Sequence, residues 1–378
     1  MTDTAPSLGP LRGLRVVEIA ALGSAPFAAM MLADAGAEVL RINRPGQRTD
    51  DPGILGRGRT ALSLDLKDLH DRDRALEAID HADVLIEGFR PGVMERLGLG
   101  PGTCLNRNPA LIYARMTGWG QDGPLAATAG HDINYLALTG ALRSIARQGE
   151  VPVPPLNLVG DYGGGGMLLV TGILAALYER VSSGTGQVVD AAMIDGTSLL
   201  MSGIWNRKAT GNWSGEPGTN SIDSGSHFYN VYRTADDAFM AVGSIEPQFY
   251  QRLLLGLGLA DADLPAQHDR AQWPAMKDLF ARIFRMKTRA EWTLVFAELD
   301  ACVSPVLALD EAVTDPHMQF RNTLVRGDRV EPAPAPRYSR TPGTAGGRGE
   351  NTEPAETLMT RWASTVRAAP ATIRTGQH

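Results

Sequence analysis

Short runs of apolar, β-branched residues alternate with helix-like segments along the first half of the chain. Residues 15–20 and 38–43 have the composition of strands. The segment between them predicts a helix with Ser24 as its N-cap, Pro26 in its first turn and Gly36 as its stop. A strand, a helix and a second strand predict a βαβ unit, which implies a parallel sheet covered by helices.

This alternation continues to about residue 205. Further strands are predicted at 83–87, 111–116 and 187–193, and helices at 166–181 and from 194 to about 201. The fold class expected for this part of the chain is therefore α/β with a parallel sheet.

The composition of the sequence changes after residue 205. A connector rich in Gly, Ser and Asn is followed by a predicted hairpin, 228–232 with 238–242, and then by helical segments. We therefore expect a large domain at 1–205, a linker at 206–224 and a smaller α+β domain at 225–320. A proline-rich passage and one helical patch, at about 356–368, follow.

Composition supports two soluble domains. The chain has 378 residues, 43% of them hydrophobic, and a formal net charge of −6. The acidic balance argues against nucleic acid as a partner. Two isolated cysteines, no secretory signal pattern and no apolar stretch of membrane-spanning length favour a cytoplasmic protein with no membrane association.

The turn after the first predicted strand lacks the glycine pattern of a dinucleotide-binding site. Residues 21–26 contain one glycine, so the G-x-G-x-x-G pattern that lets a backbone approach a pyrophosphate is missing. The sequence also has no Gly-Lys-Ser/Thr phosphate loop. We therefore expect no NAD, FAD or ATP.

His131 is the first candidate for chemistry. It follows Gly130 and precedes residues with helical spacing, so it is expected at a helix N-terminus, which disfavours a positive charge on the imidazole. A neutral histidine can act as a general base. For a single histidine taken alone, local capping or packing is the more common role.

Asp161 is the second candidate. It stands shortly before four consecutive glycines, 163–166, and a predicted apolar helix. Such glycines let the backbone come close to a ligand. The alternative is an N-cap aspartate beside a flexible glycine loop, and both roles can hold at once.

Arginines recur near the predicted strand ends. They are Arg44, the pair Arg57 and Arg59, Arg90 and Arg96. Ligands of open α/β sheets bind beyond the carboxyl ends of the strands. Arginines at that edge suit a phosphorylated ligand, whereas each one alone could be an ordinary solvated charge.

Several ordered motifs resemble the family III CoA-transferase (CaiB/BaiF) fold and, within it, the α-methylacyl-CoA racemases. The resemblance spans about residues 11–343, and its motifs are 14–18, 83–92, 96–99, 113–121, 130–135, 157–161, 184–190, 245–250 and 334–342. It implies an interlocked homodimer with a Rossmann-like large domain that the C-terminal segment, about 325–378, completes. The active site would lie where one chain's large domain meets the partner's small domain.

The resemblance also implies roles for individual residues. His131 and Asp161 correspond to the two acid/base groups, and Asp132 and Glu246 would support the catalytic site. The CoA moiety would be held by Arg44, Leu64, Asp65, Leu66, Lys67, Gly88, Phe89, Arg90, Arg96, Gly130, Ile133, Asn134 and Tyr135. No metal and no cofactor beyond the CoA of the substrate is expected.

The resemblance favours proton transfer at the α-carbon of a 2-methylacyl-CoA. Transferases of this fold share the aspartate but lack the histidine, so His131 favours a racemase. In that reaction a base on one face, an acid on the other and donors to the thioester oxygen are needed, and backbone N–H groups near Asp161 and Gly163 are candidates for the oxygen.

Two alternatives stay open. One is a CoA transferase with Asp161 as its nucleophile, and the other is a non-catalytic acyl-CoA-binding protein. The acyl chain is not identified, although Trp119, Met193, Met201 and Trp205 could contribute apolar surface for it, buried core being the other role for each.

Overall fold

The structure is a computed structural model that describes residues 9–46, 53–345 and 353–364. The chain forms two compact units. The first comprises Met1–Thr139, Leu156–Leu200 and Val325–His378, and the second comprises Gly140–Pro155 and Met201–Leu324. Residues 140–155, which the sequence predicted in the large domain, therefore belong to the second unit, and so do residues 206–224, which it predicted as a linker.

A six-stranded sheet forms the centre of the first unit. Its strands are β1 (Arg15–Ile19), β2 (Glu38–Asn43), β3 (Arg59–Ser63), β4 (Val84–Glu87), β5 (Ile112–Thr117) and β6 (Val188–Ala192). All neighbouring strands are parallel, and their order is β3-β2-β1-β4-β5-β6. This is the Rossmann order, in which the winding direction reverses between β1 and β4. The predicted α/β class is confirmed, with β3 as a strand that the sequence analysis did not predict.

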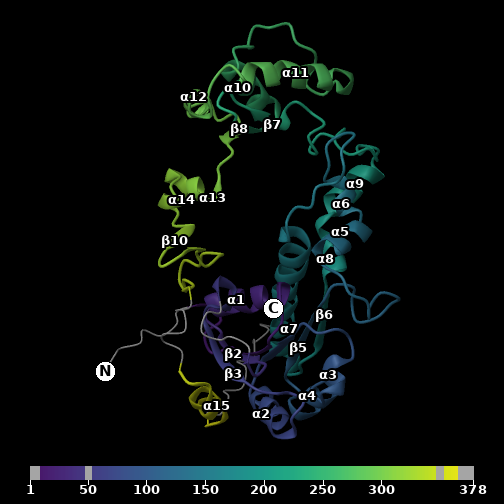
Figure 1. Cartoon of the computed structure of the whole chain (residues 1–378), viewed down its shortest axis with the longest axis vertical. Helices are drawn as coiled ribbons and strands as arrows, with labels where there is room; N and C mark the ends of the chain where they lie inside the picture. Colours follow the sequence, from purple (N-terminus) through teal and green to yellow (C-terminus); the bar gives the residue numbers. More distant parts are fainter. Residues whose placement is uncertain (1–8, 47–52, 346–352, 365–378) are drawn as a thin grey trace, which may run out of the picture. The chain divides into compact units, whose positions relative to one another are not determined.

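Helices cover both faces of this sheet (Figure 1). One apolar layer joins the strands to α1 (Ser24–Asp34) and α7 (Leu168–Ser183), through residues such as Leu32 and Ile173. The other joins them to α2 (Leu69–Asp80), α4 (Pro101–Arg107) and α15 (Ala355–Ser364), through residues such as Ile79 and Trp362. Because α15 packs on the same face as α2, the C-terminal segment completes this layer.

Helix α1 begins one residue earlier than its sequence suggested. Gly23, with a φ of 68°, is the N-cap, so Ser24 is the first helical residue and its predicted capping role is wrong. Pro26 lies in the first turn, as predicted. Gly36 has a φ of 101° just beyond the helix, which agrees with its predicted role as a stop.

The four consecutive glycines lie in a helix and not in a flexible loop. Residues Leu158–Met167 form a π-helix, labelled η2, that continues directly into α7. A Cβ on Gly164 would lie 2.8 Å from the Thr197 backbone nitrogen, and one on Gly166 would lie 2.6 Å from the Phe27 ring. The glycines therefore allow close packing of this wide helix against its neighbours.

The helical run Leu158–Ser183 is long and apolar enough, by length and composition alone, to cross a membrane. The sequence expectation concerned uninterrupted apolar residues, and this run is interrupted by Asp161, Glu179 and Arg180. Core helices of soluble proteins pass the same test, and Leu169, Val170, Ile173 and Ala176 of α7 are buried within the first unit.

The remaining elements of the first unit are short. They are η1 (Ile54–Gly56), α3 (Val93–Arg96), α5 (Asp132–Leu138), α8 (Met193–Leu200), and the two-stranded sheet of β10 (Leu324–Arg326) and β11 (Val330–Pro332). The helix predicted at 356–368 is present as α15 to Ser364, and positions 365–368 lie outside the described residues.

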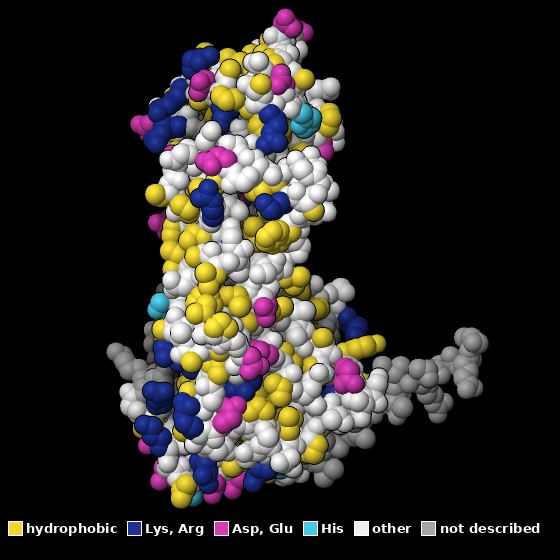
Figure 2. Space-filling view, turned by 90° about the vertical axis from the view of Figure 1, so that its right-hand side faces the viewer, with side chains coloured by type: hydrophobic (Ala, Val, Ile, Leu, Met, Phe, Trp, Pro, Cys, Tyr) yellow, Lys and Arg dark blue, Asp and Glu magenta, His cyan; other side chains and the backbone are white. Residues whose placement is uncertain are grey.

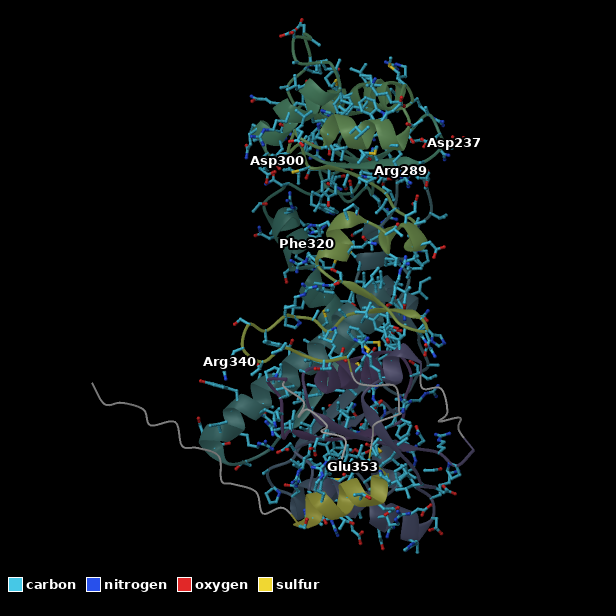
Figure 3. The ribbon with its side chains drawn as sticks, turned by 90° about the vertical axis from the view of Figure 1, so that its left-hand side faces the viewer. Asp237, Arg289, Asp300, Phe320, Arg340 and Glu353 are labelled. Carbon is cyan, nitrogen blue, oxygen red and sulfur yellow. The ribbon has the colours of Figure 1, made fainter. Side chains whose placement is uncertain are left out.

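The second unit is built on its own aromatic core. Strands β7 (Tyr229–Arg233), β8 (Phe239–Gly243) and β9 (Val303–Pro305) form an antiparallel sheet, whose first two strands are the predicted hairpin. The helices are α6 (Ala141–Ser144), α9 (Ser202–Ala209), α10 (Pro247–Gly256), η3 (Arg270–Gln272), α11 (Trp273–Phe284), α12 (Arg289–Phe296), α13 (Leu309–Ala312) and α14 (Pro316–Phe320). Phe228, Phe280 and Phe284 are fully buried between sheet and helices, while charged residues such as Asp237, Arg289 and Asp300 lie at the surface of this unit (Figure 3).

Candidate active site

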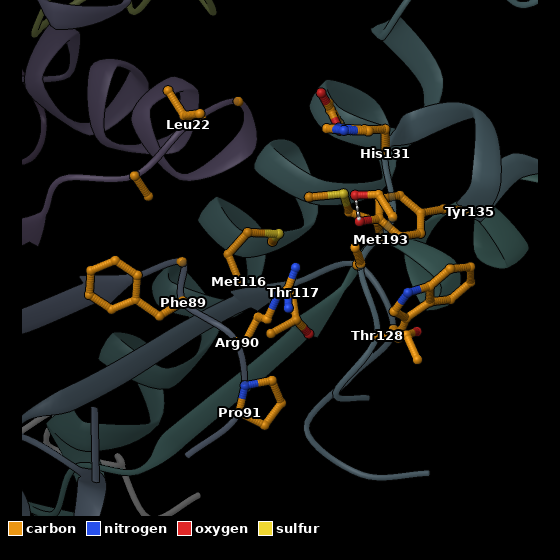
Figure 4. A pocket seen from close by; sticks show the side chains of 18 of the residues that line it. Leu22, Phe89, Arg90, Pro91, Met116, Thr117, Thr128, His131, Tyr135 and Met193 are labelled. Atoms are coloured by element: carbon orange, nitrogen blue, oxygen red, sulfur yellow. Dashed lines mark hydrogen bonds between the residues drawn. The ribbon is translucent and has the colours of Figure 1, made fainter. Parts of the chain in front are cut away.

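The main cavity of the first unit opens at the carboxyl edge of the parallel sheet. It has a volume of about 860 Å³ and lies where the loops after β1 and β4 diverge. This is the switch point at which open α/β sheets bind ligands. Eight residues predicted for catalysis or CoA binding line it, namely Arg44, Gly88, Phe89, Arg90, Gly130, His131, Tyr135 and Asp161. Figure 4 shows His131, Tyr135 and Met193 on one side of the cavity, with Leu22 and Phe89 on the other.

His131 is the N-cap of α5, as the sequence predicted. Its φ and ψ of −128° and 172° are extended, and its backbone N–H donates to Asn134 Oδ1 at 3.0 Å. The imidazole is exposed at the cavity wall. The backbone is therefore fixed by its cap, while the side chain stays accessible to a substrate.

Asp161 lies in the first turn of η2 and is half-buried. Burial raises the pKa of its carboxyl group, and the nearby Asp132 carboxylate raises it further. The Asn157 amide donates to Asp161 Oδ2 at 3.3 Å, and this contact and the charge of His131 act in the opposite direction. Asp161 is thus partly desolvated, close enough to His131 to sense its charge, and faces the same cavity.

Asp132 connects the two candidate residues but does not line the cavity. Its Oδ2 accepts a hydrogen bond from the Asp161 backbone N–H at 2.8 Å. A Cβ on Gly160 would lie 2.5 Å from that oxygen, so only glycine fits there. The Asp161 N–H is therefore already bonded, and the hypothesis that it donates to the thioester oxygen is not supported.

Tyr135 and Trp119 form one wall of the cavity. The Tyr135 hydroxyl donates to the Gly130 carbonyl at 2.5 Å, and its ring meets that of Trp119 edge-on, with centroids 4.7 Å apart. A Cβ on Gly118 would lie 2.1 Å from the Tyr135 ring. This packing fixes the loop that ends at His131.

Arg44 and Arg90 give the cavity its positive charge. Arg44 follows β2 and lies over the Phe89 ring, with 6.0 Å between the guanidinium carbon and the ring centroid. Arg90 is exposed in the loop after β4. Two guanidinium groups at the mouth of a cavity suit phosphate groups.

Other predicted residues do not line the cavity. Leu64, Asp65, Leu66, Lys67, Arg96, Asp132, Ile133, Asn134 and Glu246 are absent from its lining. Leu64 is fully buried in the core. Its N–H donates to the Asn43 carbonyl, and this hydrogen bond holds the segment that begins at Leu64 beside Arg44. Glu246 belongs to the second unit, where it is the exposed N-cap of α10.

Arg57 and Arg59 are structural, so the expectation that they hold a phosphorylated ligand is wrong. Arg57 Nε donates to Asp34 Oδ1 at 2.9 Å, and Arg59 lies 2.5 Å from the Glu18 carboxylate. All four side chains are buried. Sequence position alone could not reveal these partners, which are 23 or more residues away.

Several lining residues were missed by the sequence analysis. Leu22 and Gly23 follow β1, Met116 and Thr117 are the last two residues of β5, and all four border the cavity. Ligands of open α/β sheets bind beyond the carboxyl ends of the strands, and this rule, applied to every predicted strand, would have found these residues. Of the four acyl-chain candidates, Trp119 and Met193 line the cavity, whereas Met201 and Trp205 lie in the second unit.

No group of three or more His, Cys, Asp or Glu side chains that could hold a metal is found within the described part of the chain. Acidic and basic side chains are both spread over the face in Figure 2, with hydrophobic side chains between them. The chain as a whole has a formal net charge of −6, so the positive charge at the cavity mouth is a local feature.

Known proteins share both the sequence and the fold. Residues 11–355 match CoA-transferase family III. Alpha-methylacyl-CoA racemase of Mus musculus is 51% identical over 88% of this chain and 87% of its own length, and the Homo sapiens protein of that name is 48% identical over the same shares. Acetyl-CoA:oxalate CoA-transferase of Acetobacter aceti is 31% identical over 87% of this chain and 90% of its own length.

Solved structures agree on the fold. A CAIB/BAIF family protein from Brucella suis has a TM-score of 0.78 over 94% of this chain and 99% of its own, at 22% identity. Rv3272 from M. tuberculosis has a TM-score of 0.73 over 90% of this chain and 98% of its own, at 26% identity. The chain therefore belongs to CoA-transferase family III.

Proposed function

We propose that this protein is an α-methylacyl-CoA racemase in which His131 and Asp161 exchange the α-proton of a 2-methylacyl-CoA. The observation that carries the proposal is that these two residues line one cavity, with Asp161 partly desolvated and close to His131. The names and about 50% identity of the mammalian relatives support the same reaction.

Racemisation needs one exchangeable proton on the pair. In one direction neutral His131 removes the α-proton, the electron pair of the C–H bond moves to the thioester oxygen, and protonated Asp161 returns a proton to the opposite face. The products are a charged His131 and an ionised Asp161, which is the starting state for the reverse direction. The pair therefore carries one proton both before and after each turnover.

The raised pKa of Asp161 favours a racemase over the transferase alternative. A carboxyl group that acts as a general acid must hold its proton, and burial stabilises that protonated form. A nucleophilic carboxylate must be ionised before it attacks an acyl group. A non-catalytic acyl-CoA-binding protein would require neither residue.

Solvent exchange tests the proposal. An (R)-2-methylacyl-CoA incubated with the protein in D₂O is expected to gain deuterium at its α-carbon as it racemises. His131→Ala and Asp161→Ala are each expected to abolish both processes. Absence of deuterium with the unaltered protein would contradict the racemase proposal, and an intermediate trapped by hydroxylamine would favour the transferase.

The CoA moiety is proposed to be the sole cofactor-like group. Arg44 and Arg90 are placed for its phosphates, and Phe89, Gly88, Gly130 and Tyr135 border the same space. Leu64–Lys67, Arg96, Ile133 and Asn134 remain expectations from the family resemblance. Enolate chemistry of this kind requires only an acid, a base and hydrogen-bond donors.

A homodimer in the cytoplasm is part of the proposal. Leu174 and Tyr178 of α7 and Leu200 of α8 are exposed, with Tyr178 71% accessible, and a second copy would cover such apolar surface. Glu246 is proposed to support the catalytic site of the partner subunit. Light scattering should report twice the mass of the 40.4 kDa chain, and a monomer would contradict the dimer.

A further inference from the structure

A second cavity of the first unit adjoins the catalytic cavity. Its volume is about 330 Å³, within the size range of small-ligand pockets. It is lined by Trp119, Asp122, Gly123, Pro124, Leu125, Leu138, Thr139, Ile194, Asp195 and Ser198. Trp119 also lines the catalytic cavity, so one indole side chain lies on the boundary of both.

The lining of this second cavity suits a neutral, apolar ligand. Leu125, Leu138 and Ile194 present hydrocarbon surface, and Leu138 is 65% exposed. Its two charged lining residues, Asp122 and Asp195, are acidic, and the lining includes no Lys, Arg or His. These carboxylates would repel the phosphates of CoA, whereas a hydrocarbon chain gains by covering the exposed leucine.

Packing holds the Trp119 side chain in place. Its ring meets Tyr135 edge-on, and a Cβ on Gly130 would lie 3.0 Å from Trp119 Cζ2. The indole Nε1 is buried and makes no hydrogen bond in the described structure. Replacing the indole by another ring therefore removes no hydrogen bond, while removing the ring opens the boundary. Tyr135, whose ring the indole meets edge-on, is labelled on the same side of the catalytic cavity as His131 (Figure 4).

We propose that Trp119 determines acyl-chain specificity by separating the catalytic cavity from this second, apolar cavity. The second cavity is the space into which the distal part of a long acyl chain extends when the indole is absent. Trp119 thereby limits the chain length that the enzyme accepts. This inference rests on the racemase function proposed above.

Deuterium exchange with two substrates tests the inference. A 2-methylacyl-CoA with a short (butanoyl) chain and one with a long (dodecanoyl) chain are compared by kcat/KM. Trp119→Ala is expected to raise the long-to-short ratio by about tenfold or more, since added apolar contacts in a pocket change kcat/KM by about that factor. Trp119→Leu is expected to shift the ratio in the same direction and serves if the alanine variant does not fold.

Three controls separate the possible causes. Trp119→Phe keeps a ring but removes the N–H group, so its ratio should stay near that of the unaltered protein. Phe320→Ala truncates an exposed aromatic side chain of the second unit and should not change the ratio. Ser198→Trp, added to Trp119→Ala, fills the second cavity from α8 and should reverse the gain.

The outcomes distinguish this inference from the function on which it rests. The folded Trp119→Ala and Trp119→Leu variants could exchange the short substrate normally and keep the long-to-short ratio of kcat/KM unchanged. That result would overturn the role of Trp119 and leave the racemase proposal intact. A gain that Ser198→Trp does not reverse would overturn the role of the second cavity. Absence of exchange with the unaltered protein on either substrate would overturn the racemase proposal and this inference with it.

Discussion

Glu18 and Asp161 are both carboxylates withdrawn from water in the first unit, but their surroundings differ. Glu18 is fully buried and has two arginines beside it, Arg59 at 2.5 Å and Arg41 at 3.5 Å. Asp161 is half-buried, and the group that donates to its side chain is the neutral amide of Asn157. A structural carboxylate is neutralised by cations, whereas a carboxylate that must hold and release a proton is desolvated without a cationic partner.

Asp161→Asn gives the largest expected effect. Racemisation should fall by roughly 10³-fold or more, because a general acid is lost. The free energy of unfolding should not fall. Burial makes Asp161 bind its proton more tightly in the native protein than in the unfolded chain, so ionisation of Asp161 at a pH above its pKa lowers the stability of the native protein. Asparagine does not ionise and therefore does not cause this loss. Deuterium exchange and thermal unfolding at neutral pH measure both effects, and a marked loss of Tm would contradict the comparison.

Arg59→Met is expected to act on stability instead. It leaves Glu18 buried without its nearest cation, at a cost of about 3–5 kcal/mol in the free energy of unfolding. Urea unfolding measures this loss. The matched control is Glu18→Leu combined with Arg59→Met, which removes both charges and should recover most of the stability. If the Arg59→Met protein is as stable as the unaltered protein, the ion pair of Arg59 and Glu18 is not structural.

Arg90→Ala is expected to raise KM for the acyl-CoA about tenfold, equivalent to about 1.4 kcal/mol, with a smaller change in kcat. The reason is the loss of a guanidinium group at the cavity mouth. Steady-state kinetics at two salt concentrations provide the measurement, because phosphate contacts weaken with salt. Arg282→Ala, at an exposed position of α11, is the control and should leave KM unchanged.

Asn157→Ala should produce the smallest effect, a shift of the pH–rate profile. The Asn157 amide stabilises the ionised form of Asp161, so its loss raises the pKa of that carboxyl group further. The profile of kcat/KM should therefore move to higher pH. A profile that stays in place or moves to lower pH would show that this amide does not set the proton affinity of Asp161.

Much of the first unit could be predicted because its signals are local. Apolar runs located β1, β2, β4, β5 and β6, and a helical segment with glycine after it located α1. Strand β3, Arg59–Ser63, was missed because its arginine and alternate exposed positions do not form an apolar run. The π-helix η2 was missed because consecutive glycines have low helix propensity, and tertiary packing overrides that propensity here.

The candidate site was predicted only in part because its contacts are long-range. His131 and Asp161 were identified, but the hydrogen bond from the Asp161 N–H to Asp132 spans 29 residues and has no local signal. For the same reason the sequence could not separate Arg44 and Arg90, which line the cavity, from Arg57 and Arg59, which pair with distant carboxylates.

The glycines of η2 have a consequence for how this enzyme can change. Gly164 and Gly166 are each closed to a side chain by a different neighbour, Thr197 in one case and Phe27 in the other. A single substitution at either position would displace the helix that carries Asp161, so a saturation library should be depleted there. Position 119 already carries a side chain outside η2, so its exchange does not displace that helix, although Gly118 beside it is closed to a side chain by the Tyr135 ring. Evolution can therefore alter the acyl specificity of this scaffold while its proton chemistry stays fixed.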